Sequence, residues 1–307
     1  MSIAGSREYS YVVGSQGVRL DRYVAENCPG LTRTQAQRLI VAGLVKVNGA
    51  VARASLKLSL GDRVTVTIPP PTPSHPEPEA IPFGILYEDD DVLVIDKPAG
   101  LPVHPAPGHP SHTLVNAVLA YLSFTPDTSD PMRPGIVHRL DMNTSGVMLV
   151  AKNRTAQADI IKQFNSYAVT KVYLVLVKGR LTPEHGTIEA PIGRDTRNRK
   201  RMAVTAEDQG RPARTRYRVV RYIDNYTLLE AMPETGRTHQ IRVHLSAVGH
   251  PVVGDATYGV KSAYLSRQFL HSHRLGFRLP STGEYVEFES ALPSDLEQAL
   301  SHFTEVN

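Results

Sequence analysis

A polar segment near the middle of the chain holds the residues whose types and spacing could do chemistry. It runs from residue 135 to residue 146 (GIVHRLDMNTSG) and leads directly into the apolar run Gly146–Ala151. Polar loops at the edge of a sheet commonly carry active-site groups, and a carboxylate such as Asp141 can serve there as a nucleophile or a general base. Taken alone, Asp141 could equally be a carboxylate that caps its own loop.

Other familiar catalytic arrangements are missing from the sequence. His104, His109 and His112 lie close together, but in a Pro- and Gly-rich loop without the spacing of metal ligands on a helix, and Cys28 is the single cysteine. The sequence contains no phosphate-binding glycine motif and no GxSxG motif around a nucleophilic serine. We therefore expect no metal and no cofactor.

The charge of the chain is distributed unevenly. The 307 residues carry a formal net charge of +4, but residues 1–70 contribute +5 and residues 194–221 contribute +7, so the remainder is acidic. Two basic zones of this kind favour a polyanionic partner, because they attract phosphates over long distances. They could also be ordinary solvated surfaces, and charge alone does not choose between the two interpretations.

The first basic zone has the pattern of a small binding module that spans residues 17–70. Apolar residues at helical spacing predict two helices, and the second begins with a capping-box pair of Thr32 and Gln35. Strand patterns follow at residues 44–47 and 64–68. Two basic helices on a small sheet support binding rather than chemistry.

A proline-rich stretch separates this module from the rest of the chain. Residues 69–82 contain seven prolines in fourteen positions, which favours an extended, semi-rigid spacer. We place the spacer at residues 71–82 and a single larger domain at residues 83–307.

The larger domain contains more strands than helices. Short β-rich runs occur at residues 85–87, 92–95, 146–151, 172–177 and 226–231. Helical patterns occur near residues 114–122 and 156–164. Because strands and helices do not alternate regularly, we predict the α+β class, with a small N-terminal α/β module and a larger domain built on a mixed, largely antiparallel sheet.

The segment HRLDMNTSG at residues 138–146 resembles the signature loop of the RluA-type pseudouridine synthases. Other segments resemble motifs of the same family in the same order, at residues 96–105, 171–173 and 236–259. The N-terminal module resembles the alpha-L, ribosomal-protein-like RNA-binding domain that many of these enzymes carry. The resemblance covers residues 18 to about 292, and it points to the RluD subgroup.

This resemblance implies three catalytic residues. Asp141 takes the place of the catalytic aspartate, and Arg242 that of the arginine that keeps it ionised, since a nearby cation favours the charged form of a carboxylate. Tyr173 takes the place of the aromatic residue that stacks under the target uracil, with the C5 proton as a second task. Without the motif, Arg242 would pass for an ordinary surface arginine. We predict a helix at residues 238–248, with Val248 on its buried face.

The resemblance also implies a set of RNA-binding residues. The target nucleotide has to leave its stack, and Arg139 can fill the vacated place with its planar guanidinium. His138 is expected to order its loop rather than to act as an acid, and the arginines of residues 194–221 are expected to lie over backbone phosphates. The full set is Arg139, His138, Arg237, His239, Arg33, Arg38 and Lys46.

These patterns together predict an enzyme that isomerises specific uridines to pseudouridine in large-subunit (23S) ribosomal RNA. No secretory signal or membrane-spanning run is visible, so we expect a cytoplasmic protein without a membrane partner, and a monomer. One alternative is a related synthase that acts on other ribosomal or transfer RNA uridines. Another is a non-catalytic RNA-binding factor in ribosome assembly.

Overall fold

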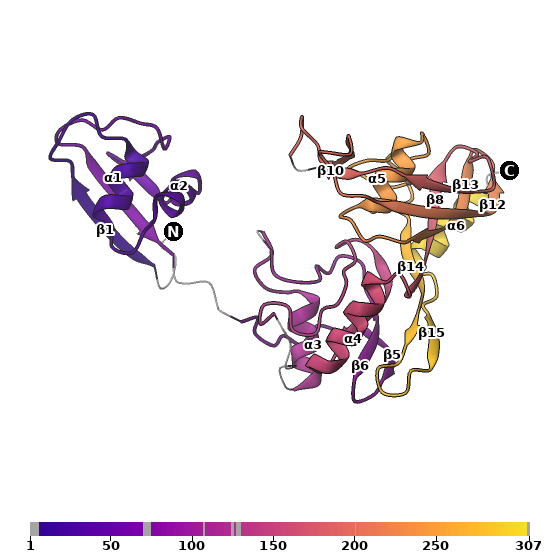
Figure 1. The fold of residues 1–307 in the computed structure, drawn as a ribbon. Coiled ribbons are helices and arrows are strands. Elements are labelled where there is room, and N and C mark those ends of the chain that lie inside the picture. Colours follow the sequence, from indigo (N-terminus) through magenta and orange to yellow (C-terminus); the bar gives the residue numbers. More distant parts are fainter. Residues whose placement is uncertain are drawn as a thin grey trace. The chain divides into compact units, whose positions relative to one another are not determined.

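The structure of the protein is a computed structural model that describes residues 6–69, 75–106, 108–123, 126, 130–199 and 201–305. The chain divides into two compact units, residues 1–73 and residues 74–307 (Figure 1). Residues 71–74 of the predicted spacer lie outside the described residues, as does Lys200 of the second basic zone.

The first unit is an antiparallel four-stranded sheet whose apolar face is covered by two helices. The sheet order is β1 (Arg7–Val12), β4 (Arg63–Ile68), β2 (Val45–Val47) and β3 (Ala50–Val51). The helices are α1 (Leu20–Asn27) and α2 (Arg33–Val41). Thr32 and Gln35 form the predicted capping box, and Leu20, Ile40 and Val64 meet in the core.

The second unit is built on a nine-stranded sheet. In sheet order the strands are β5 (Gly84–Glu88), β6 (Val92–Lys97), β7 (Ser145–Ala151), β14 (Leu270–Arg278), β8 (Thr170–Lys178), β13 (Tyr226–Pro233), β12 (Arg214–Ile223) and β9 (His185–Glu189), with β15 (Tyr285–Glu289) also paired to β14. A separate hairpin joins β10 (Ile192–Arg194) and β11 (Met202–Val204). In the described sheet only β7 and β14 pair in parallel, so the predicted α+β class and largely antiparallel sheet are confirmed.

Four helices complete the second unit. They are α3 (Leu114–Leu122), α4 (Arg154–Asn165), α5 (Gln240–Ala247) and α6 (Ser294–Glu305). Helix α4 packs on β7 and β14, whereas α5 packs on β11, β12 and β13. In Figure 1, α3 and α4 accompany the half of the sheet around β5 and β6, and α5 accompanies the half around β8, β12 and β13.

The two halves of this sheet meet where β7 pairs with β14. Gly146 has a φ of +110°, and a Cβ atom there would lie 2.1 Å from the carbonyl oxygen of Ser272. Only glycine permits this close approach of two backbones. The contact fixes the end of the polar loop that precedes β7. One strand further, Tyr173 of β8 pairs with Ser272, so the loop and the tyrosine lie over the same part of the sheet.

Two details differ from the sequence predictions. Helix α5 begins at Gln240 rather than at residue 238, because His239 adopts a left-handed conformation with a φ of 58°. The prediction that Val248 is buried is wrong, since its side chain is 44% exposed just beyond the end of the helix. In the proline-rich stretch, the carbonyl oxygen of Glu77 accepts from Nδ2 of Asn116 in α3, and the N–H of Glu79 donates to the carbonyl oxygen of Asn116, so this part belongs to the second unit.

Candidate active site

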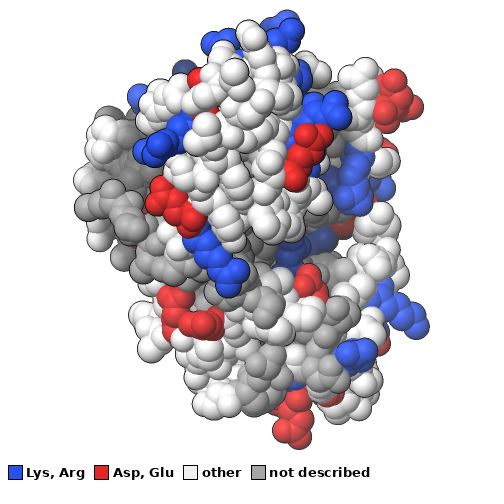
Figure 2. All heavy atoms as spheres, turned by 90° about the vertical axis from the view of Figure 1, so that its left-hand side faces the viewer, with Lys and Arg blue, Asp and Glu red and all other residues white. Residues whose placement is uncertain are grey.

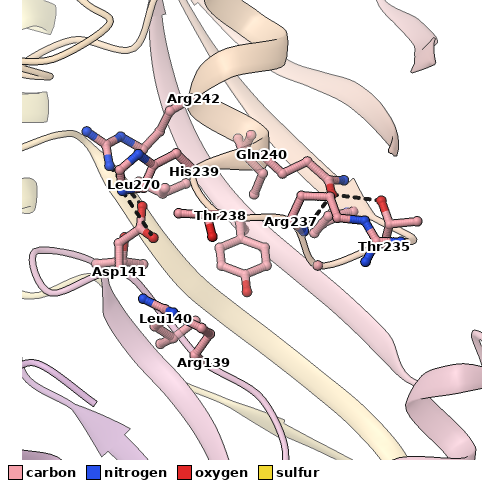
Figure 3. Close-up of a pocket in the computed structure, with 15 residues that line it drawn as sticks. Arg139, Leu140, Asp141, Thr235, Arg237, Thr238, His239, Gln240, Arg242 and Leu270 are labelled. Atoms are coloured by element: carbon pink, nitrogen blue, oxygen red, sulfur yellow. Dashed lines mark hydrogen bonds and ion pairs between the residues drawn. The ribbon is translucent and has the colours of Figure 1, made fainter. Parts of the chain in front are cut away.

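A buried chain of charges connects the polar loop to helix α5. Arg242 donates from Nη1 to Oδ2 of Asp141 at 2.9 Å, and from Nε and Nη2 to the two carboxylate oxygens of Asp255 at 2.7 and 2.8 Å. The guanidinium thus bridges two carboxylates from separate segments, and Figure 3 shows Asp141 and Arg242 pointing toward each other. The fork of arginine suits such a bidentate contact.

The two carboxylates beside Arg242 favour the charged form of its guanidinium group. Burial by itself lowers the pKa of Arg242, but the adjoining carboxylates of Asp255 and Asp141 outweigh it and raise the pKa overall. Burial in turn raises the pKa of Asp255, and the hydrogen bonds from Arg242 lower it overall. Arg242 is only 6% exposed, so the surface arginine that the sequence alone would suggest is excluded.

Of these three charged side chains, Asp141 is the one whose carboxylate faces an open space. Its side chain is 18% exposed, against 0% for Asp255. While Oδ2 accepts from Arg242, Oδ1 lies 4.0 Å from Nε2 of His239, beyond hydrogen-bond distance. Asp141 lines a pocket whose walls come from four regions of the chain. The lining residues are Arg139, Leu140, Asp141, Thr144, Tyr173, Leu270 and residues 233 and 235–242.

Tyr173 forms part of the wall of the same pocket. It projects from β8, where it is 9% exposed and shares a face with Val175 and Val177, as the alternation of the strand predicts. Burial raises the pKa of Tyr173 to about 12, a hydrogen bond with Ser272 opposes the shift, and the charge of Asp141 adds to it. The side chain is therefore a neutral phenol at physiological pH.

Lys97 ties the loop of Asp141 to the segment that follows β6. Its fully buried ammonium group donates to the carbonyl oxygens of Pro98, Leu101 and Met142 at 2.7 to 3.1 Å. Burial, with Arg267 nearby, lowers the pKa of Lys97 to about 7, whereas Asp141 acts in the opposite direction. Three carbonyl acceptors match the three N–H groups of an ammonium ion. The sequence motif contains Lys97, but the sequence assigns it no role.

Gln240 fixes the turn that forms the opposite wall of the pocket. Its Oε1 accepts from Thr235 Oγ1 at 2.7 Å and from the backbone N–H of Arg237 at 3.0 Å. Its Nε2 donates to the carbonyl oxygen of Arg214 and to Thr215 Oγ1, both at 3.0 Å. All four hydrogen-bonding positions of the amide are thus used, which ties the turn to strand β12. Figure 3 shows the contacts of Gln240 with Thr235 and Arg237.

The sequence matches a known family model over most of this region. Residues 91–247 match the model described as RNA pseudouridylate synthase, and residues 18–64 match the S4 domain. The chain belongs to the pseudouridine synthase family. It is therefore an isomerase that acts on RNA, and its N-terminal module is an RNA-binding S4 domain.

Relatives and solved structures agree with this assignment. An RNA pseudouridine synthase of Chloroflexus aurantiacus is 50% identical, with 92% of this chain and 89% of that protein covered. The ribosomal large subunit pseudouridine synthase D of Zymomonas mobilis is 40% identical over 92% of this chain and 93% of that protein. The structure of human RNA pseudouridylate synthase domain containing 4 aligns with a TM-score of 0.57 at 25% identity, covering 72% of this chain and 92% of that one.

The predicted RNA-binding residues of this synthase fall into different surroundings. Arg139 is exposed at the rim of the pocket, and Arg237 lines it half-buried while donating to the carbonyl oxygen of Pro212. His239 lies on the pocket wall. His138 instead accepts a hydrogen bond at Nε2 from the backbone N–H of Leu149 in β7 and stacks on Phe164 of α4, which anchors its loop to these two elements.

Three of the predicted residues lie in the S4 domain. Arg38 and Lys46 are exposed, but Arg33 donates to the fully buried Asp21, which also binds Arg19. Asp21 therefore has a structural role at the start of α1. The S4 domain and the domain that contains the pocket are separate compact units.

The second basic zone divides into a paired and an unpaired part. On β12, Arg214, Arg216 and Arg218 alternate on one exposed face, but all three form ion pairs with glutamates on or next to the neighbouring strands β9 and β13. The expectation that all arginines of this zone lie over phosphates does not take these ion pairs with glutamates into account. On the face in Figure 2, Lys and Arg side chains stand in several groups among Asp and Glu rather than in one continuous patch.

The histidines of the early loop do not assemble into a metal-binding cluster. His112 contacts Glu79 with 3.3 Å between Nδ1 and Oε2, whereas His104 is buried. In the described part of the chain, no three His, Cys, Asp or Glu side chains are arranged to hold a metal ion. Nor do the described helices include one that is long and apolar enough to cross a membrane.

Proposed function

We propose that this synthase isomerises specific uridines of large-subunit (23S) ribosomal RNA, with Asp141 as the catalytic carboxylate and without a cofactor. The observation that carries the proposal is the Asp141–Arg242–Asp255 chain, which presents one carboxylate to a pocket on an RNA-modifying enzyme. The choice of RNA is supported by the Zymomonas mobilis relative, which is named for the large ribosomal subunit.

The reaction requires one bond to be exchanged for another on the same ribose. The bond between N1 and C1′ breaks, the uracil turns, a bond forms between C5 and C1′, the proton leaves C5, and N1 gains a proton. No electrons are exchanged with a second molecule, so an ionised carboxylate is the minimal reagent. Arg242 supplies a positive charge beside Oδ2 of Asp141 and fixes the orientation of the carboxylate, and Oδ1 is the oxygen turned toward the substrate.

Tyr173 supplies an aromatic surface in this proposal. A ring on the pocket wall can stack on the uracil while it turns, and stacking of a base on an aromatic side chain contributes about 1–3 kcal/mol. The raised pKa of Tyr173 keeps the phenol protonated. We therefore assign it stacking rather than removal of the C5 proton.

The pocket requires the uridine to leave its stack. Extrusion costs a few kcal/mol, and Arg139 stands exposed at the rim, where its planar guanidinium can occupy the vacated position. Arg237 and His239 line the pocket beside the flipped nucleotide. Arg38 and Lys46 belong to the surface with which the S4 domain holds the RNA. Because His138 is engaged with β7 and α4, we assign it no RNA contact.

A single chain contributes every group named in this mechanism. We accordingly propose that the enzyme works as a monomer, and in the cytoplasm, where large-subunit RNA is transcribed and folded. No step of the proposal involves a membrane.

The test is to map pseudouridines by chemical labelling in a strain that lacks the gene, with wild-type and Asp141→Asn genes as complements. The proposal predicts that specific 23S sites are lost in the knock-out and restored only by the wild-type gene. Loss confined to transfer RNA would support the related-synthase alternative. Normal pseudouridine everywhere, with defective ribosome assembly, would support the non-catalytic factor.

A further inference from the structure

An arginine-rich hairpin beside the pocket differs from the arginine stripe of β12. This basic hairpin consists of β10, β11 and the described residues between them, 195–199 and 201. Arg197 and Arg199 are exposed, and no salt bridge involves their guanidinium groups within the described part of the chain. Unpaired, exposed arginines are suited to phosphate contacts, so this hairpin is the part of the second basic zone best placed to hold RNA.

One side chain connects this hairpin to the catalytic groups. Tyr258 is 8% exposed, and its hydroxyl oxygen accepts from the backbone N–H of Met202 at 2.8 Å and lies 2.8 Å from Nδ1 of His239. Its ring contacts two guanidinium groups, with 5.0 Å from the ring centroid to Cζ of Arg201 and 5.1 Å to Cζ of Arg242. One of these cations belongs to the hairpin and the other to the catalytic site.

The hydroxyl group also contacts the histidine that faces Asp141. When the Tyr258 hydroxyl donates its proton to Nδ1, the proton of neutral His239 lies on Nε2. That atom is the one 4.0 Å from Oδ1 of Asp141. The Tyr258 oxygen therefore contacts both the hairpin backbone at Met202 and the histidine beside the reacting carboxylate.

We propose that Tyr258 is a positioning residue that couples contact between the basic hairpin and the RNA backbone to the alignment of His239 and Arg242 with Asp141. The inference rests on the catalytic role proposed for Asp141. It predicts that the hairpin contributes to the rate of the bound complex as well as to RNA binding, and that this contribution requires the Tyr258 hydroxyl.

A double-mutant cycle in the full-length enzyme tests the coupling. The variants are Tyr258→Phe, which keeps the ring in contact with the two arginines and removes both hydroxyl contacts, and Arg197→Ala with Arg199→Ala in the hairpin. The measurements are the Kd for a 23S fragment and the single-turnover rate at saturating RNA. We expect Tyr258→Phe to slow the saturated rate about tenfold with Kd changed less than about twofold, and the hairpin variant to weaken binding and slow the saturated rate about fivefold.

The decisive comparison is the combined variant. If the hairpin acts through Tyr258, the combined variant has the saturated rate of Tyr258→Phe alone while keeping the weakened Kd. If the two effects on the rate multiply, or if the hairpin variant changes Kd only, the coupling is refuted. Unchanged rate and Kd in Tyr258→Phe would refute it as well.

Tyr222→Phe is the matched control, because Tyr222 also pairs its hydroxyl with a backbone group and its ring with an arginine. Its hydroxyl donates to the carbonyl oxygen of Leu181, and Cζ of Arg180 lies 4.4 Å from its ring centroid. This control should leave the rate unchanged and should not alter the effect of the hairpin variant. Asp141→Asn distinguishes the proposed catalytic role from the proposed coupling. Activity in that variant contradicts the catalytic role of Asp141. Rate effects that multiply in the double-mutant cycle contradict only the coupling through Tyr258.

Discussion

Arg242 is held between two carboxylates that play different parts. Asp255 is fully buried and binds the guanidinium with both oxygens, while Asp141 binds it with one oxygen and keeps the other toward the pocket. The buried carboxylate thus sets the orientation of the arginine, and the arginine sets the orientation of the reacting carboxylate. Lysine could not replace this fork, because it offers a point charge.

Replacing Asp255 by Asn should slow the reaction without weakening RNA binding. The amide would leave Arg242 with one neutral oxygen acceptor, so the guanidinium would lose its fixed orientation toward Asp141. We expect a loss of about 10²-fold in the single-turnover rate, the scale of a misplaced catalytic group, with Kd for RNA within about threefold. Circular dichroism melting controls for folding, and a wild-type rate in a folded Asp255→Asn enzyme would contradict the assignment.

Two substitutions at Tyr173 distinguish stacking from proton transfer. Tyr173→Phe keeps the ring and should reduce the rate by no more than about tenfold, whereas Tyr173→Leu removes it and should cost more. Loss of a general base typically costs 10²- to 10⁴-fold. Equal losses of that size in both variants would show that the hydroxyl handles a proton. Because the pKa of Tyr173 is raised to about 12, the wild-type rate should show no Tyr173 ionisation between pH 7 and 10.

The residues of the site could be predicted only where a motif contains them. The motif resemblance placed Asp141, Tyr173 and Arg242, and the structure brings all three to one pocket. It did not reveal what holds them, because the partners of Lys97 and Tyr258 are set by the tertiary fold. Three backbone carbonyls receive Lys97 and a hairpin N–H reaches Tyr258, and no local spacing encodes such contacts.

At the scale of elements, the predictable strands are those with uninterrupted apolar runs. β6, β7, β8 and β13 follow the predicted runs within a few residues at each end. β14 lies at the centre of the sheet but is not predicted from the sequence, because His271 and Ser272 interrupt its apolar pattern. Both are buried and satisfied, His271 by Ser145 and Ser290, and Ser272 by the carbonyl oxygen of Val147. β1 is not predicted from the sequence either, because neither of its faces is fully buried.

Asp21 anchors the two helices of the S4 domain, and its removal should destabilise that domain. Arg19, Arg33 and Gln37 all donate to its carboxylate, and we expect Asp21→Asn to cost about 1–2 kcal/mol at pH 7, with allowance for the partly exposed arginines. Calorimetric unfolding of the full chain measures the loss. The exposed Glu26, paired with Arg22, provides the control Glu26→Gln, which should cost less than about 0.5 kcal/mol.

The same variant has a predicted pH dependence. The hydrogen bond from Arg19 is the main cause that lowers the pKa of Asp21 in the folded state, against the effect of burial. A lowered folded pKa means that the stabilisation is present above the unfolded value of about 3.9 and is lost as the pH falls through the folded value. The difference between wild type and Asp21→Asn should therefore be constant from pH 5 to 7 and shrink below about pH 4. A constant difference down to pH 2 would contradict the ion-pair account.

At the scale of the whole molecule, charge is distributed unevenly although the net charge is small. The S4 unit is basic. The second unit is acidic apart from one basic zone near the pocket. The sequence predicts this zone, but it cannot show that the β12 arginines are paired with glutamates while Arg197 and Arg199 are not. That distinction depends on the register of β12 with β13 and β9.

Deletion of residues 1–73 should weaken RNA binding and leave the chemistry. The remaining residues form a compact unit that contains the whole pocket. We expect a higher Kd, and a dependence of log Kd on log salt concentration that is smaller by roughly one for each lost phosphate contact. The single-turnover rate at saturating RNA should stay within about fivefold of wild type. A folded fragment with no activity at any RNA concentration would contradict this division.

The most direct test of the central claim is pseudouridine formation by purified Asp141→Asn enzyme on 23S ribosomal RNA, measured beside its RNA affinity. The substitution preserves the size of the side chain and removes the charge that Arg242 faces at 2.9 Å. The account predicts no detectable pseudouridine, with Kd for RNA within about threefold of wild type. Turnover at a rate near that of wild type would contradict it.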